Sequence, residues 1–185
     1  GNYTPGEWSV MDYGPYNNDS RTPPTYSAYE RNAMGWLDLQ TISEATSVKL
    51  DDIKDSNKAA VIGTSRPNEF FLFENRQQTS WDTYLPGHGM LIWHIDYLQS
   101  VWDGNTVNND PDHQFVDLVE ANGVGKSAQG AAWPGALDKT EFTASTTPAF
   151  IDWYKKDPGL PITGIMEDNG KIYFDVDGGN FVLAS

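Results

Sequence analysis

The sequence predicts a mainly β fold, an antiparallel sheet or sandwich, with one short helix near the N-terminus. Short β-branched or aromatic runs bounded by Gly, Pro, Asn or Asp recur from about residue 41 onward. Asn169-Gly170 lies between two such runs, and this dipeptide accepts the positive φ angles of a tight hairpin turn. Helical spacing of apolar residues occurs convincingly in one segment, residues 25–37.

The predicted helix has the sequence TYSAYERNAMGWL. Pro24 is tolerated just before a first turn, Thr25 or Ser27 can act as the N-cap, and Gly35 stands near the expected end. The apolar residues that share one helical face are Tyr26, Tyr29, Ala33 and Trp36 with Leu37. We expect this face to pack on the sheet.

Six strands are predicted after the helix. They are AAVIGT (59–64), EFFLFEN (69–75), GMLIWHID (89–96), FVDLVEA (115–121), TGIME (163–167) and KIYFDV (171–176). The run 69–75 is apolar at both alternating sets of positions, which predicts a central strand covered on both faces. The segment 124–147 is rich in Gly, Ala and Thr, so we predict a long loop or ribbon outside the core.

Composition narrows the possible partners and compartments. Asp and Glu number 26 against 12 Lys and Arg, a formal charge of −14, so nucleic-acid binding and attraction to anionic membrane surfaces are not expected. No run approaches the roughly 20 apolar residues of a membrane span, and we expect no membrane insertion. The chain has no cysteine, which excludes disulfides and thiolate metal sites and fits the cytosol, a bacterial surface or the periplasm.

The segment WSVMDYG, residues 8–14, carries the first chemical signal. Ser9, Met11 and Tyr13 fit the pattern Ser-x-Met-x-Tyr, which resembles the Met-turn of metzincin zinc peptidases, and the resemblance implies a methionine beneath the metal. A five-residue pattern is weak alone, and a buried methionine that fills a gap in an ordinary turn is the alternative. The opening residues, Gly1 to Gly6, suggest a tag remnant joined to a segment of a longer protein.

The combination GEWSVMDYGPYNN…RTPPTYSAYERNAMGWL, followed by FFLFENRQ, WDTYLPGHGMLIWHID and VDLVEANG, resembles the immune inhibitor A-like zinc metallopeptidases, which are of the metzincin type. The resemblance implies the C-terminal part of a secreted or cell-surface endopeptidase that cleaves proteins or peptides with zinc. Residues 1–45 would end its catalytic domain, with Met11 as the Met-turn and Tyr13 near the metal or oxyanion. Residues 46–185 would form a β-rich domain.

This chain lacks the family's zinc helix. The required His-Glu-x-x-His, two ligands at i and i+4 with a general base between them, occurs nowhere, so no zinc ligand is assigned to any residue. His88 and His94 are six residues apart, about 20 Å along a strand, too far to share an ion. We therefore predict hydrogen-bonded structural histidines, a surface position for His113, and no peptidase activity for this chain alone.

The loop 103–112 is dense in oxygen ligands of the kind calcium takes. The candidate calcium ligands are Asp103, Asn105, Asp110 and Asp112. EF-hand spacing is absent, because Val107 stands at a ligand position and no Glu closes the loop. A solvated turn is the alternative.

Two carboxylates lie in apolar strands. Glu74 and Arg76 share a side of one strand end, which predicts a buried ion pair rather than a catalytic acid, whereas Glu120 has no identifiable carboxylate partner. A different functional class is also open, a non-catalytic β-sandwich module that binds a glycan or a protein partner through exposed loop tryptophans such as Trp102 or Trp133. A structural wall with calcium in the 103–112 loop is a third reading. The oligomeric state stays open.

Overall fold

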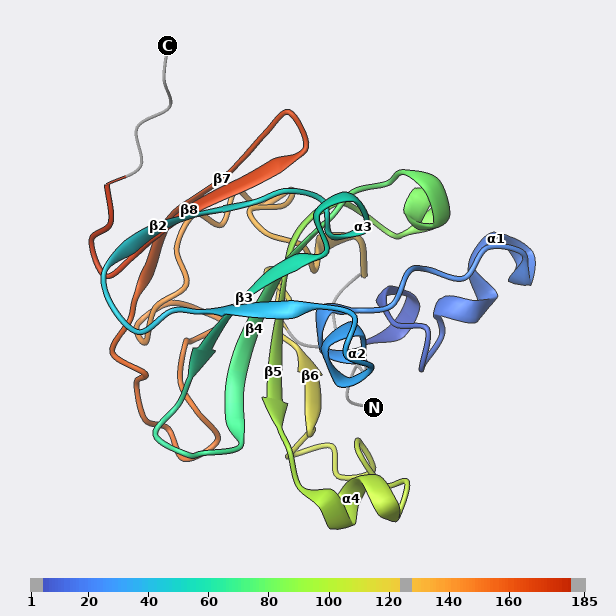
Figure 1. Cartoon of the computed structure of the whole chain (residues 1–185), viewed down its shortest axis with the longest axis horizontal. Helices are drawn as coiled ribbons and strands as arrows, with labels where there is room; N and C mark the ends of the chain where they lie inside the picture. The colour runs from blue at the N-terminus through green and yellow to red at the C-terminus, as the bar shows by residue number, and fades with distance from the viewer. Residues whose placement is uncertain (1–4, 124–127, 181–185) are drawn as a thin grey trace.

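A computed structural model describes residues 5–123 and 128–180 and shows a mainly β protein with two sheets (Figure 1). The larger sheet has the order β1-β3-β4-β5-β6, in which β1 is parallel to β3 and every other pair is antiparallel. Its strands are β1 (Asp38–Thr41), β3 (Lys58–Gly63), β4 (Glu69–Arg76), β5 (Gly89–Asp96) and β6 (Val116–Leu118). The predicted fold class is confirmed, and β4 is the central strand that its sequence indicates.

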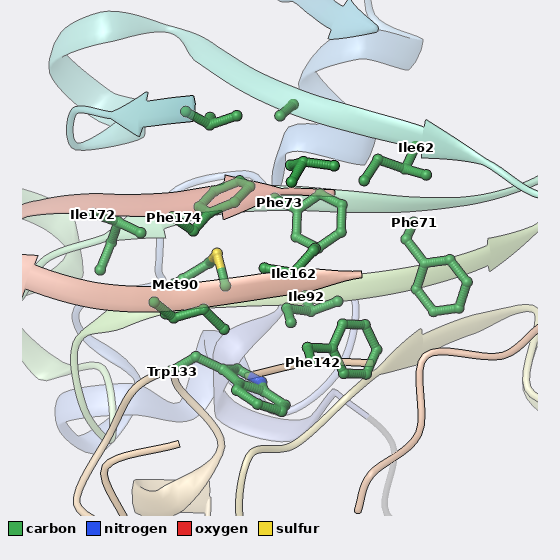
Figure 2. Packing of buried hydrophobic residues seen from close by; sticks show 14 of the residues in the cluster. Ile62, Phe71, Phe73, Met90, Ile92, Trp133, Phe142, Ile162, Ile172 and Phe174 are labelled. Atoms are coloured by element: carbon green, nitrogen blue, oxygen red, sulfur yellow. The ribbon is translucent and has the colours of Figure 1, made fainter. Parts of the chain in front are cut away.

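The smaller sheet is antiparallel, with the order β2-β8-β7. Its strands are β2 (Thr46–Leu50), β7 (Ile162–Asp168) and β8 (Lys171–Val176). Residues from both sheets form one apolar core, which Figure 2 shows from close by with Phe73 and Ile92 from the larger sheet beside Phe174 and Ile162 from the smaller one. The two sheets therefore pack as the layers of a sandwich.

The other face of the larger sheet is buried as well. Alternation along β4 and β5 sends Leu72, Leu91 and Trp93 to this second face, where they form a cluster with Trp8 from the start of the chain. All four side chains are at most 1% exposed. The N-terminal segment thus covers the face of the larger sheet opposite to the smaller sheet.

The helix of the N-terminal segment, α2, is shorter than predicted and runs over Ala28–Ala33. Ser27 is the N-cap in a reciprocal capping box with Glu30, and Gly35 beyond the end has a φ of 74°, as the sequence indicates. The predicted apolar face is wrong in part, because Tyr26 and Trp36 are 41% and 57% exposed. With six residues the helix spans fewer than two turns, so residues 26 and 36 lie outside it.

The remaining helical elements of the described residues are single turns. They are α1 (Asn17–Ser20), in which Asn18 and Asp19 have left-handed backbone angles, the α-helical turns α3 (Ile53–Ser56) and α4 (Gln99–Asp103), and the 3₁₀ turns η1 (Gly6–Trp8), η2 (Gly14–Tyr16), η3 (Ser80–Tyr84) and η4 (Ala128–Gly130). No helix among these residues is long and apolar enough to cross a membrane.

The tight turn between β7 and β8 is confirmed. Asn169 and Gly170 have φ angles of 49° and 72°, and Asp168 pairs directly with Lys171, so the two-residue loop has the mirror-image geometry that its sequence favours. The five predicted runs at 59–64, 69–75, 89–96, 163–167 and 171–176 lie within one or two residues of β3, β4, β5, β7 and β8. The run 115–121 forms only the three-residue strand β6.

The prediction that residues 124–147 stay outside the core is wrong where the structure describes them. Trp133 and Phe142 are fully buried between the sheets. Each is held by an isolated bridge, Trp133 to Met90 and Phe142 to Ile162. Residues 1–4 and 124–127 lie outside the described residues, including most of the predicted tag remnant.

Candidate functional site: the Met11 turn and its buried support

Residues 6–14 form a compact turn that is closed by its own backbone. Tyr13 N donates to Gly6 O at 3.1 Å, and Gly14 N donates to Ser9 O at 2.9 Å. The Ser9 hydroxyl accepts from Met11 N at 3.1 Å, so the serine of the pattern fixes the methionine's backbone. A side chain at Gly14 would place its Cβ 2.4 Å from Ser9 O, which explains why glycine follows the motif.

The turn presents its two characteristic side chains to solvent. Met11 is 79% exposed and Tyr13 is 65% exposed. Trp8, which immediately precedes Ser9, is fully buried instead. It packs in the cluster on the second face of the larger sheet, and its Nε1 donates to Ala128 O at 3.0 Å. A rigid turn anchored by one aromatic residue therefore displays a methionine, a residue type usually found inside.

Further large apolar side chains are exposed in the N-terminal segment and in η3. Besides the turn, Trp36 is 57% exposed and Trp81, in η3, is 61% exposed. The exposed set in these segments consists of Met11, Tyr13, Tyr16, Tyr26, Met34, Trp36, Trp81 and Tyr84, and we call it the aromatic surface. Within this set, Tyr13 contacts Tyr16 and Tyr26 contacts Trp36. Exposed apolar side chains that form a contiguous patch are typical of a surface that another molecule or domain covers.

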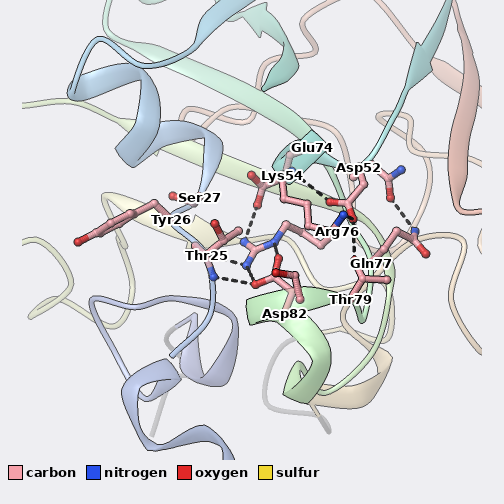
Figure 3. Close-up of polar contacts among 12 residues, drawn as sticks. Thr25, Tyr26, Ser27, Asp52, Lys54, Glu74, Arg76, Gln77, Thr79 and Asp82 are labelled. Atoms are coloured by element: carbon pink, nitrogen blue, oxygen red, sulfur yellow. Dashed lines mark hydrogen bonds and ion pairs between the residues drawn. The ribbon is translucent and has the colours of Figure 1, made fainter. Parts of the chain in front are cut away.

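A buried ionic network between β4 and η3 lies against residues 25–28 of the N-terminal segment (Figure 3). The guanidinium of Arg76 at the end of β4 donates to both carboxylate oxygens of Asp82 at 2.8 and 2.9 Å and to Glu74 Oε1 at 3.3 Å. All three side chains are at most 1% exposed. Burial lowers the pKa of Arg76, but the two carboxylates outweigh burial and raise that pKa above its ordinary value.

The same network binds the N-terminal segment through its backbone. Asp82 Oδ1 accepts from Thr25 N at 2.7 Å, Arg76 Nη2 donates to Thr25 O at 3.0 Å, and Glu74 Oε2 accepts from Ala28 N at 2.6 Å. Glu74 thereby binds the first helical N–H group of α2, at the positive end of the helix dipole. The predicted ion pair of Glu74 and Arg76 is confirmed, whereas the third member, Asp82, is not evident from the sequence.

The histidines do not form a metal site. Among residues 5–123 and 128–180, no group of three or more His, Asp or Glu side chains is placed to hold a metal ion, so the described residues do not fit zinc. His94 Nε2 lies 2.8 Å from Glu69 Oε1, and His88 Nδ1 lies 2.9 Å from Glu167 Oε1, as predicted for structural histidines. His113 is not a simple surface residue, because its half-buried ring contacts Asp96 at 2.9 Å.

The predicted calcium loop is an exposed turn around α4. Asp103 Oδ1 accepts from Gln99 Nε2 at 2.8 Å, and Asp110 Oδ1 accepts from Asp112 N at 2.9 Å. Asn105 has a φ of 50°, in the left-handed region that asparagine tolerates. These short-range contacts are those of a polar turn, and calcium binding here stays a prediction.

Three other predicted residues have different surroundings from those expected. Trp133 is a core residue and Trp102 is half-buried against Tyr97, so neither is the exposed platform considered for a binding module. Glu120 is 6% exposed, and burial raises its pKa to about 7. It is therefore partly protonated at neutral pH, which reduces the cost of burying its carboxyl group.

Comparison of this chain with protein-family models, with curated proteins and with solved structures finds no match. The resemblance to the immune inhibitor A-like peptidases therefore rests on the sequence motifs quoted above. The geometry of the Met11 turn is a separate observation, independent of that resemblance.

Proposed function

We propose that this chain is part of a secreted zinc endopeptidase of the immune inhibitor A-like type, to which it contributes the Met-turn and a β-rich supporting domain. One observation carries the proposal: Met11 is 79% exposed on a turn whose backbone is closed by hydrogen bonds. Displaying an apolar side chain on a fixed turn is useful when another structure covers it. In the parent, that structure would be the helix bearing the zinc ligands, and the substrate would be a protein or peptide.

The surroundings of the turn agree with this role. Trp8 and the network of Glu74, Arg76 and Asp82 hold the segment against the β sandwich, so the sandwich would act as a buttress for the floor of the cleft. The exposed side chains of Tyr13 and Tyr16, in and just after the turn, would add apolar contacts to a packed domain. The zinc and the general base would come from outside this chain.

The chain alone is expected to hydrolyse no peptide, with or without added zinc, because the described residues do not fit a zinc site. A general fluorogenic peptide assay with a chelator control measures this. Zinc-dependent turnover that the chelator abolishes would contradict the proposal. The coding sequence upstream of Asn2 gives a second test, in which a His-Glu-x-x-His motif within a few tens of residues is expected and its absence would refute the assignment.

A second candidate function is a module that binds a glycan or a protein partner. Trp36 and Trp81 favour it, because exposed indole rings stack on sugars. Under this alternative, a polysaccharide protects tryptophan fluorescence from iodide quenching in the wild type but not in a Trp36→Ala/Trp81→Ala double variant. Equal quenching with and without polysaccharide is the result expected of the peptidase fragment.

A further inference from the structure

The four methionines of this chain differ widely in exposure. Met11, in the turn of residues 6–14, is 79% exposed, and Met34, the C-cap of α2, is 40% exposed. Met166 in β7 is half-buried, whereas Met90 in β5 is fully buried. The thioether of Met11 is therefore the one that a dissolved molecule reaches most easily.

Methionine is the only sulfur-containing residue type in this chain. There is no cysteine, so no thiol competes for an oxidant. The sulfur of methionine is soft and polarizable, and oxidants of the hydroperoxide class convert it to a sulfoxide. A hydroperoxide that meets the folded chain is therefore expected to react first at Met11.

The hydrogen bonds that close the turn do not involve the Met11 side chain. Tyr13 N donates to Gly6 O, and Gly14 N donates to Ser9 O. The Ser9 hydroxyl accepts from the backbone N–H group of Met11. Because the Met11 side chain is exposed, an oxygen added to its sulfur enters solvent and leaves these hydrogen bonds intact.

The same reaction at Met90 would have a different effect on the fold. Met90 lies among the apolar side chains between the two sheets, as Figure 2 shows. A sulfoxide at this position would place a polar oxygen in the core, which is costly unless the oxygen finds a hydrogen-bond donor. The fold thus displays the methionine whose oxidation it tolerates and shields the one whose oxidation it does not.

We propose that Met11 is a redox modification site, at which a hydroperoxide oxidises the exposed thioether to a sulfoxide without loss of the fold. The sulfur lone pair attacks the terminal peroxide oxygen, the O–O bond breaks and an S–O bond forms. The sulfur gives up two electrons, the hydroxyl proton of the peroxide passes to the leaving oxygen, and the peroxide is reduced to an alcohol or to water. Methionine sulfoxide reductases reverse the step with a dithiol, which becomes a disulfide while the oxygen leaves as water.

Oxidation changes the chemical character of the surface that the turn displays. The apolar side chain of Met11 becomes polar and chiral. The consequence for the parent rests on the function proposed above. There, the sulfoxide would oppose packing of the covering structure on Met11, because its polar S–O group would lose contact with water. Once the turn is covered, Met11 would be shielded from the oxidant.

The first experiment treats the folded chain with hydrogen peroxide and follows each methionine by mass spectrometry of proteolytic peptides. The sulfoxide is expected to form at Met11 about twofold faster than at Met34, in proportion to their exposed fractions, and at least about tenfold faster than at Met90. In urea these differences are expected to vanish, because every thioether is then exposed. Equal rates in the folded chain, or a faster reaction at Met34 than at Met11, would overturn the site.

The second experiment measures whether the fold survives. A Met34→Leu/Met166→Leu variant keeps only Met11 and the buried Met90. Its oxidised form is expected to melt within about 2 °C of the untreated form, and the reductases for the two sulfoxide epimers are expected to restore the thioether. Adding Met11→Leu gives the matched control, which keeps an apolar side chain and is expected to take up no oxygen under the same treatment. A clearly larger fall in melting temperature on oxidation of Met11, or a sulfoxide that the reductases leave in place, would contradict the proposal.

The parent protein, expressed with its upstream coding sequence, separates this inference from the proposed function. Met11 is expected to be oxidised more slowly in the parent than in this chain alone. Equal rates in both would contradict the covering of Met11 and would leave the modification site standing. A slower reaction at Met11 than at Met34 in this chain alone would remove the modification site, whatever the parent shows.

Discussion

Replacing Arg76 by leucine is expected to lower the free energy of unfolding by about 3–5 kcal/mol, the usual result of removing one partner from a buried ion network. The change leaves the carboxylates of Glu74 and Asp82 buried without their cation. It also removes the donor to Thr25 O, so we expect the N-terminal segment to detach from the sheet before the rest of the protein unfolds. Urea unfolding followed by circular dichroism gives the loss.

Arg21→Leu is the matched control, because its ion pair with Asp19 is exposed at both ends, and exposed pairs contribute little. The two variants remove the same charge from the same residue type. A loss for Arg76→Leu as small as that for Arg21→Leu would show that the network does not hold the segment. Recovery of stability in a triple variant that also neutralises Glu74→Gln and Asp82→Asn would assign the loss to unpaired charge.

Replacing Trp8 by alanine is expected to cost about 3–5 kcal/mol, the range for truncation of a large buried aromatic side chain. Trp8 is fully buried, packs against the second face of the larger sheet and donates to Ala128 O. Because it immediately precedes the Met11 turn, its loss removes the anchor as well as the packing. Denaturant unfolding measures the stability, and amide exchange across residues 6–14 measures the turn.

Trp81→Ala is the corresponding control, since Trp81 is 61% exposed and its truncation is expected to change stability by less than about 0.5 kcal/mol. Fast amide exchange confined to residues 6–14 in the Trp8 variant would support its role as the anchor. An undisturbed turn in a destabilised Trp8→Ala protein would show instead that the closed backbone of the turn suffices.

The elements predictable from sequence are those whose signal is local. The hairpin at Asn169-Gly170 depends on two residues that accept positive φ, and the cap of α2 depends on Ser27 and Glu30, so neither needs knowledge of the rest of the fold. The central position of β4 follows from a run that is apolar on both faces. The ion pair of Glu74 and Arg76 follows from the cost of leaving either group buried alone.

The elements that escape prediction depend on partners far away in the sequence. The strands β1 and β2 are short and largely polar, lie at sheet edges, and owe their conformation to pairing with β3 and β8. Trp133 lies in a Gly- and Ala-rich segment, and its backbone pairs with that of Met90, which places it in the core. Asp82 binds Arg76 because η3 lies next to the end of β4 in the folded protein. A local sequence pattern does not reveal this contact.

The parallel pairing of β1 with β3 bears on how such a protein can be divided. The predicted boundary at residues 45 and 46 falls just after a strand that is already a member of the larger sheet. A cut at this boundary would separate the edge strand β1 from β3. The larger sheet would lose its edge strand, and β1 would be left unpaired. We therefore expect neither part to keep its full stability when the chain is divided at this boundary.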